Sequence, residues 1–243
     1  MKHFFSAKTK QSIYRIGFYL FLTCSILLFG CVLFLLVRGN YFAMWKQATS
    51  DAAYDYTKNA SYVQRQTQFE MLPARDVDVV FAGDSITARF EWQEYFSSLT
   101  VVNRGIDSDV SEGLKNRLDS IIAEKPEKIF IMIGINDIRQ KIPTEQTVRN
   151  YSEIIASLRQ SLPACSIYIE SVLPVNHATG IDNAQVRALN DQLRALAEKE
   201  GLTYIDIYSH MTSSDDDFLY TEDGVHPTGE GYRIWMDVLS DYL

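Results

Sequence analysis

After Arg75 the chain alternates short apolar runs with amphipathic segments, and this alternation limits its fold more than any other feature. The apolar runs have the β-branched composition of buried strands and occupy residues 77–82, 99–103, 128–133, 166–172 and 202–207. Helical spacing marks residues 86–96, 110–124, 144–162, 183–200 and 229–243. The pattern predicts an α/β fold, a flavodoxin-like three-layer α/β/α sandwich around a five-stranded parallel sheet in the order 2-1-3-4-5.

A long apolar run, Ile16–Val37, contains no charged residue. As an α-helix it spans about 33 Å, enough to cross the hydrocarbon core of a membrane. Four basic residues precede it and fewer lie close behind it, so the positive-inside rule places the N-terminus in the cytoplasm and the body outside the cell. We therefore expect one uncleaved transmembrane signal anchor. A cleaved signal peptide and lipoprotein-type cleavage before Cys31 are the alternatives.

The charge of the body argues against one class of partner. Residues 1–40 carry five Lys and Arg and no acid, which leaves 18 basic against 31 acidic residues in the remainder. So acidic a surface argues against nucleic acid as a partner. Cys24 and Cys31 lie within the apolar run, so Cys165 alone belongs to the body and no intrachain disulfide is expected there.

Residues 38–72 form a polar stretch between the anchor and the first predicted strand. Aromatic residues are scattered through it, and no Gly or Pro interrupts it between Tyr41 and Pro73. This predicts either a helical stalk or a helix that lies across the body. The expected organisation is a cytoplasmic tail (1–15), an anchor (16–37), a stalk or linker helix (38–72) and a globular domain (73–243).

The first strand ends in Gly83-Asp84-Ser85, which places a hydroxyl at the start of a helix. Open α/β sheets bind ligands at the carboxyl ends of their strands. The N–H groups at a helix start favour negative charge at the same place. Ser85 is therefore a candidate nucleophile, and the simpler interpretation is that Asp84 and Ser85 only cap the helix.

A nucleophilic serine needs a base, and histidine is the usual one. The chain has four histidines: His3, His177, His210 and His226. His3 lies in the predicted cytoplasmic tail, and His177 and His210 have no distinctive neighbours. His226 follows the last strand within Asp223-Gly224-Val225-His226-Pro227. In such a turn Asp223 can hydrogen-bond imidazole Nδ1 and leave Nε2 facing the hydroxyl.

Oxyanion donors are expected at the ends of the neighbouring strands. The second strand ends at Gly105, whose N–H is not covered by a side chain. The third is followed by Gly134-Ile135-Asn136-Asp137, which places the Asn136 amide at the same edge. With the Ser85 N–H, these groups would supply three donors to a tetrahedral oxyanion.

Together these four blocks resemble the conserved blocks of the SGNH/GDSL hydrolase family. They are Gly83-Asp84-Ser85-Ile86-Thr87, Gly105, Gly134-Ile135-Asn136-Asp137 and Asp223-Gly224-Val225-His226-Pro227, in family order over residues 77–240. The resemblance implies ester hydrolysis through an acyl-enzyme, with Ser85 as nucleophile, His226 as base, Asp223 as its orienter and Ser85, Gly105 and Asn136 as oxyanion hole. It implies no metal or organic cofactor. The second block is the loosest match, because Asp107-Ser108-Asp109 stand where relatives often have further glycines.

Small residues around the site and the lack of a long apolar lid favour a short acyl group such as acetyl. Resemblance to the platelet-activating-factor acetylhydrolase-like and carbohydrate-esterase branches points the same way. We therefore expect a membrane-anchored extracellular serine esterase that acts on cell-surface polysaccharide. A lipid ester as substrate, acyl transfer to a sugar, and a non-catalytic binding module are the alternatives. Arg89, Phe90 and Asn176 are candidates for the mouth of the site.

Overall fold

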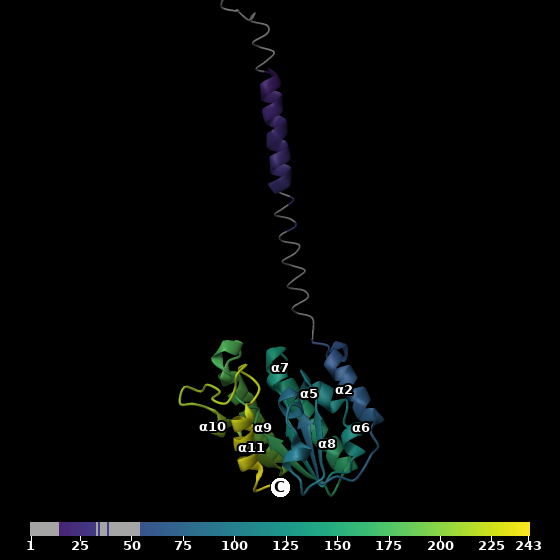
Figure 1. The fold of residues 1–243 in the computed structure, drawn as a ribbon. Helices are drawn as coiled ribbons and strands as arrows, with labels where there is room; N and C mark the ends of the chain where they lie inside the picture. Colours follow the sequence, from purple (N-terminus) through teal and green to yellow (C-terminus); the bar gives the residue numbers. More distant parts are fainter. Residues whose placement is uncertain (1–14, 33, 35–37, 39–53) are drawn as a thin grey trace, which may run out of the picture. The chain divides into compact units, whose positions relative to one another are not determined.

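A computed structural model describes residues 15–32, 34, 38 and 54–243 of the chain (Figure 1). The chain divides into two compact units, Met1–Ala53 and Tyr54–Leu243. In the first unit an apolar helix covers Arg15–Val32, with a mean hydropathy of 1.9. It is long and apolar enough to cross a membrane. Residues 33 and 35–37 of the predicted anchor and residues 39–53 of the predicted stalk lie outside the described residues.

The second unit is built on a five-stranded parallel sheet in the order β2-β1-β3-β4-β5, as predicted. Its strands are β1 (Val79–Gly83), β2 (Val101–Gly105), β3 (Lys128–Met132), β4 (Ser166–Glu170) and β5 (Thr203–Ile205). Every residue of β1 is buried, which explains its continuous apolar run. Gly83 is in register with Gly105 on one side and with Met132 on the other. The carboxyl ends of the three strands therefore meet at one edge.

The helices include α7 (Ile135–Arg139) and α10 (Tyr208–Met211), which were not predicted from the sequence, and two of the predicted helices are interrupted. Their bounds are α2 (Ala60–Met71), α3 (Ser85–Ala88), α4 (Trp92–Tyr95), α5 (Ser111–Lys115), α6 (Asp119–Ile122), α7 (Ile135–Arg139), α8 (Thr144–Ser161), α9 (Asn183–Glu200), α10 (Tyr208–Met211) and α11 (Gly229–Leu239), with short 3₁₀ turns η1 (Tyr56–Lys58) and η2 (His177–Thr179). The single helices predicted over 86–96 and 110–124 are wrong, because each is split in two. The Asn103 amide binds the carbonyl oxygens of Thr87, Ala88 and Phe90 and so ends α3. Arg117, between α5 and α6, turns into the interior.

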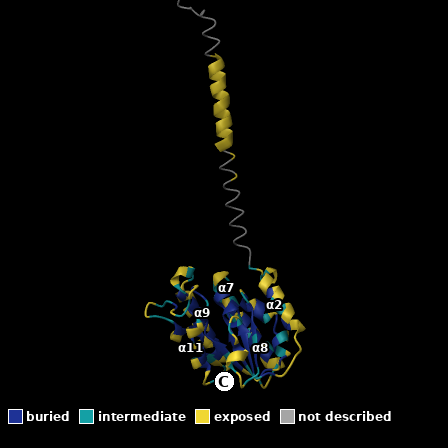
Figure 2. Ribbon diagram, in the orientation of Figure 1, coloured by how far each residue is buried: buried dark blue, intermediate teal, exposed yellow. Residues whose placement is uncertain are grey.

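Aromatic side chains fill the face of the sheet that α4 and α11 cover. Phe81, Phe130 and Tyr168 occupy one register row of β1, β3 and β4 and stack in sequence, with centroids 5.1 and 4.6 Å apart. Trp92 of α4 stacks on Phe81 at 3.6 Å and meets Trp235 of α11 edge-on at 5.2 Å. Figure 2 shows the sheet as a buried layer beneath exposed helix surfaces. The chain reverses its direction across the sheet after β2, and such a reversal places helices on both faces of a parallel sheet.

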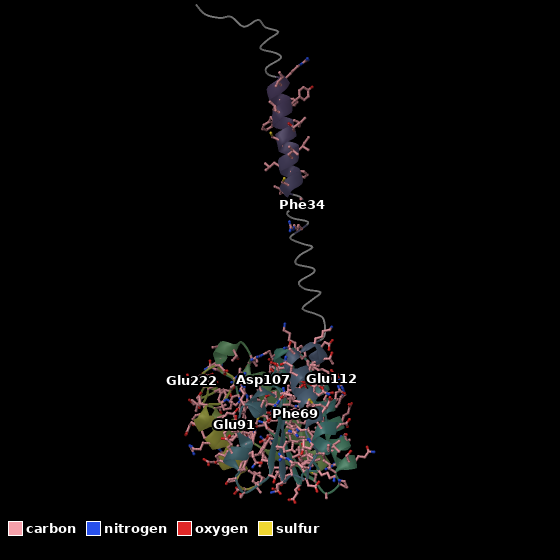
Figure 3. All side chains as sticks on the ribbon, turned by 45° about the vertical axis from the view of Figure 1, so that its right-hand side comes forward. Phe34, Phe69, Glu91, Asp107, Glu112 and Glu222 are labelled. Atoms are coloured by element: carbon pink, nitrogen blue, oxygen red, sulfur yellow. The ribbon has the colours of Figure 1, made fainter. Side chains whose placement is uncertain are left out.

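Helix α2 lies across the body, which decides between the two alternatives for this part of the chain. Its Tyr62 and Phe69 are buried in a small cluster with Ile106. The Tyr62 hydroxyl donates to the Gly113 carbonyl at 3.1 Å, and the Arg104 guanidinium lies 4.6 Å above the Phe69 ring. Phe69 is labelled on this helix in Figure 3. Residues 54–72 therefore belong to the compact unit that contains the sheet.

Candidate active site

Ser85 begins helix α3 immediately after β1, at the edge where the strand ends meet. Gly83 permits this close packing, because a Cβ there would lie 2.2 Å from the Met132 carbonyl oxygen. The Asp84 carboxylate caps α3 by accepting the Ile86 N–H at 2.9 Å. The first N–H groups of a helix have no intrahelical acceptor, so the Ser85 N–H is available to a ligand. Asp84 is thus the cap, and Ser85 is left for another role.

The structure brings Ser85, His226 and Asp223 into one hydrogen-bonded chain. The Ser85 Oγ lies 2.8 Å from His226 Nε2, and His226 Nδ1 lies 2.6 Å from Asp223 Oδ2. Ser85 and His226 are 141 residues apart in the sequence, so the fold alone creates this pair. His177 and His210 are exposed elsewhere, and His3 lies outside the described residues.

The turn around Asp223 holds its carboxylate in place. Asp223 Oδ1 accepts the backbone N–H groups of Val225 at 3.0 Å and His226 at 2.8 Å. Partial burial alone would raise the pKa of the Asp223 carboxyl, but the hydrogen bonds from the His226 backbone and imidazole outweigh it and hold the pKa well below its usual range. Gly224 has a φ of +86°, which favours glycine at this turn. An ionised Asp223 keeps the proton of a neutral imidazole on Nδ1 and leaves Nε2 to accept from Ser85.

Asn136 lies on α7, directly after β3, where the sequence places it. Its side chain is buried, and Nδ2 donates to the Asp109 carbonyl at 3.0 Å. An amide nitrogen carries two protons, so one remains for a substrate oxygen. Asn136 therefore fits the predicted donor role.

The Gly105 N–H, a predicted oxyanion donor, already has a hydrogen-bond acceptor within the protein. This N–H donates to Asn103 Oδ1 at 2.9 Å. Glycine is needed at 105 for packing, because a Cβ there would lie 2.3 Å from the Ala88 backbone nitrogen. Asn103 thus engages both the end of α3 and the Gly105 N–H, a role that no sequence motif indicated.

The backbone N–H of Ser108, in the loop after β2, is a second candidate donor to the oxyanion. Ser108 has a φ of +61°, an uncommon conformation for a residue with a side chain. The next residue, Asp109, holds Asn136 through its carbonyl, so this loop lies beside the Asn136 amide. In the sequence, this segment was marked only by Asp107-Ser108-Asp109 standing where relatives often have glycines.

A buried charge network lies beneath the site and was not found from the sequence. Arg117 donates to Asp109 Oδ2 at 2.8 Å, to the Arg104 carbonyl at 2.8 Å and to the Gly83 carbonyl at 2.9 Å. It therefore joins the ends of β1 and β2 to the loop beside Asn136. Burial raises the pKa of Asp109 to about 6 and that of Asp84 to about 7.

The three candidates for the mouth differ in position. Arg89 Nη1 lies 3.8 Å from Asp223 Oδ2, and its Nε lies 3.7 Å from Asp107 Oδ1. Phe90 stacks on Tyr232 at 4.5 Å. The Asn176 N–H donates to the Gly224 carbonyl at 2.8 Å and so braces the Asp223 turn. Arg89 is therefore the one of the three that faces the charged groups of the site.

Residues 81–234 match the GDSL-like lipase/acylhydrolase family, and this segment contains all the candidate site residues. The chain belongs to this family. It is accordingly an ester hydrolase of the GDSL type, with the family's α/β fold.

Solved structures and curated relatives agree with this assignment. A Streptococcus pneumonia protein described as a platelet activating factor superposes with a TM-score of 0.71 at 28% identity, covering 82% of this chain and 98% of its own. A GDSL-like lipase from Bacteroides thetaiotaomicron has a TM-score of 0.65 at 26% identity, covering 75% and 97%. The platelet-activating factor acetylhydrolase IB subunit alpha2 of Rattus norvegicus is 24% identical over 195 residues, covering 76% of this chain and 84% of the relative.

Proposed function

We propose that the chain is a membrane-anchored extracellular serine esterase that hydrolyses short-chain esters, acetyl esters above all. The observation that carries the catalytic part is the chain from Ser85 Oγ through His226 to Asp223, with distances of 2.8 and 2.6 Å. These are the separations at which a hydroxyl can pass its proton to an imidazole that a carboxylate orients.

In the proposed mechanism Ser85 Oγ attacks the ester carbonyl while His226 Nε2 takes its proton. The Ser85 N–H, the Asn136 amide and the Ser108 N–H donate to the oxyanion; Ser108 takes the role first given to Gly105. The C–O bond of the ester then breaks, and the alcohol leaves with the proton from His226. Water, activated by the same imidazole, hydrolyses the acyl-enzyme and frees Ser85.

Two observations support a short acyl group. The cavity beside Gly105 and Arg89 is lined mainly by polar side chains, which do not suit a long acyl chain. The rat relative is named an acetylhydrolase. A wall or capsule polysaccharide with O-acetyl groups is the substrate we favour, and a lipid ester or acyl transfer to a sugar is the alternative.

The membrane part of the proposal rests on the apolar helix Arg15–Val32 and on the basic residues that precede Ile16. An anchor with this charge bias leaves the N-terminus in the cytoplasm and Ser85 outside the cell.

Hydrolysis of p-nitrophenyl acetate by the full-length protein in detergent micelles tests the catalytic proposal. We expect measurable turnover that falls by a factor of at least 10³ in Ser85→Ala. Equal rates for the two proteins would leave the non-catalytic binding module as the better account. A series of p-nitrophenyl esters then tests acyl length, and a preference for long chains would favour the lipid alternative.

A further inference from the structure

A cavity of about 320 Å³ lies between helix α2 and the loop after β2. Helix α2 contributes Ser61, Gln64, Arg65 and Gln68, which recur at helical spacing on one face. Arg89 and Asp107 line the opposite wall, together with the backbone around Ala88 and Gly105. We call this space the α2 cavity.

The α2 cavity is joined to the candidate active site through Arg89. The Arg89 N–H donates to the Ser85 carbonyl at 3.1 Å, so its backbone lies one helical turn after the nucleophile. Its guanidinium bridges Asp223 and Asp107 at 3.8 and 3.7 Å. A group that extends from an ester bound at Ser85 can therefore reach this cavity.

The wall formed by α2 is held firmly. Tyr62 and Phe69, on a neighbouring face of the helix, are buried against the body, and Tyr62 also donates to the Gly113 carbonyl. The Arg65 guanidinium rests 4.7 Å over the Phe69 ring and donates to Gln68 Oε1 at 3.0 Å. The polar face of α2 is thus fixed over the cavity.

The polar residues that line the α2 cavity determine which kind of ligand it can bind. Six of the side chains are polar, and no large apolar side chain is among the described residues that line the cavity. Such a surface does not suit an acyl chain but suits hydroxyl groups, which the amides of Gln64 and Gln68 can bind. Asp107 and Asp223 share the Arg89 guanidinium. The Arg65 guanidinium, in contrast, has no acidic partner among the described interactions and can bind an anionic group of a ligand. Guanidinium groups bind carboxylates with directional, charge-assisted hydrogen bonds.

We propose that the α2 cavity binds the alcohol part of the ester, and that this alcohol is a sugar unit that carries a carboxylate. The inference rests on the proposed esterase function and narrows its substrate to acetylated acidic polysaccharide. Arg65 is the specificity-determining residue in this proposal, because its side chain lines the α2 cavity. It has no contact with Ser85, His226 or Asp223 among the described interactions, so its replacement does not remove a contact of the catalytic residues.

The test uses the full-length protein in detergent and two matched substrates, an O-acetylated methyl glucuronide and an O-acetylated methyl glucoside. We expect the wild type to prefer the glucuronide ester in kcat/KM by about tenfold or more, as expected for a charge-assisted hydrogen bond. Arg65→Gln should remove about tenfold of this preference, and Arg65→Glu should remove more. Because each ratio is taken on one protein, partial loss of folded enzyme cancels.

Arg149→Gln, an exposed arginine on α8, is the matched control and should leave the ratio unchanged. A wild-type ratio near one, or equal ratios in Arg65→Gln and Arg149→Gln, would overturn the inference. A higher kcat/KM on acetylglycerophosphate than on the glucuronide ester would also overturn it, in favour of a phosphate-bearing lipid headgroup. Failure of the esterase function itself is distinguishable, since the wild type would then match Ser85→Ala on p-nitrophenyl acetate.

Discussion

At the scale of single residues, the site depends on the positions of two protons, one between His226 Nδ1 and Asp223 and one between Ser85 Oγ and His226 Nε2. Asp223 accepts three hydrogen bonds from the His226 turn, two from backbone N–H groups and one from the imidazole. Its pKa lies well below the usual range of a carboxyl, so Asp223 is ionised at neutral pH. In the proposed mechanism the carboxylate therefore contributes an orientation and a negative charge, while the proton passes from Ser85 to His226 and on to the leaving alcohol without reaching Asp223.

Asp223→Asn tests this division of roles. The amide oxygen can take the place of Oδ1 and keep both backbone hydrogen bonds, but the NH₂ group that replaces Oδ2 cannot accept the proton of Nδ1 and favours the wrong tautomer. We expect kcat for p-nitrophenyl acetate to fall on the order of 10³–10⁴-fold with little change in melting temperature. A loss of less than tenfold would show that His226 is oriented by other groups.

A second residue-scale prediction concerns Glu170, which is buried at the end of β4 and accepts the Trp235 indole N–H at 2.7 Å. Burial raises the pKa of Glu170 to about 8, and the Trp235 hydrogen bond only partly opposes this. In the unfolded chain the Glu170 carboxyl has its ordinary pKa of about 4.3. The folded state therefore loses stability as pH rises from that value to about 8.

Glu170→Gln keeps an acceptor for Trp235 and removes the titration. Below pH 4 the two proteins should differ little. The melting temperature of the variant should exceed that of the wild type by a growing margin between pH 5 and 8, with no further growth above about pH 9. A margin that does not change with pH would mean that Glu170 is not the group responsible.

At the scale of elements, sequence patterns located all five strands but not the internal breaks of two helices. Strand position follows from apolar runs, which are local. The end of α3 depends on Asn103, and the gap between α5 and α6 depends on Arg117, which binds groups of β1, β2 and the loop after β2. These contacts are long-range, so no local pattern reveals them. The engagement of the Gly105 N–H was missed for a different reason, because its acceptor Asn103 is only two residues away and nothing in the sequence indicated that its side chain turns back to that N–H.

Helix α2 is attached to the body through its buried side chains, of which Phe69 is one. Phe69→Ala should remove the ring that lies beneath the Arg104 guanidinium and against Ile106, at a cost of about 3 kcal/mol in the free energy of unfolding. Val63 is 45% exposed on the same helix, so Val63→Ala should cost under about 0.5 kcal/mol. Urea denaturation of both variants measures the difference. Equal midpoints would indicate that α2 does not contribute to the cooperative unit.

At the scale of the whole molecule, the chain combines a catalytic unit, Tyr54–Leu243, with an apolar helix outside it. The pattern in the first forty residues predicted this combination because hydrophobic length and charge bias are local properties of sequence. The family assignment extends over residues 81–234 and leaves the apolar helix out, so the membrane role needs its own evidence.

Membrane attachment and orientation are tested together in intact cells. If residues 16–37 are an uncleaved anchor, the full chain should sediment with membranes, resist extraction by high salt and dissolve in detergent. Protease added outside should remove the catalytic unit and leave a fragment with the N-terminus, because the basic residues hold that end in the cytoplasm. A shortened chain in the medium would instead indicate a cleaved signal peptide. Protection from protease in sealed cells, with digestion only after lysis, would reverse the proposed orientation and exclude a cell-surface polysaccharide as substrate.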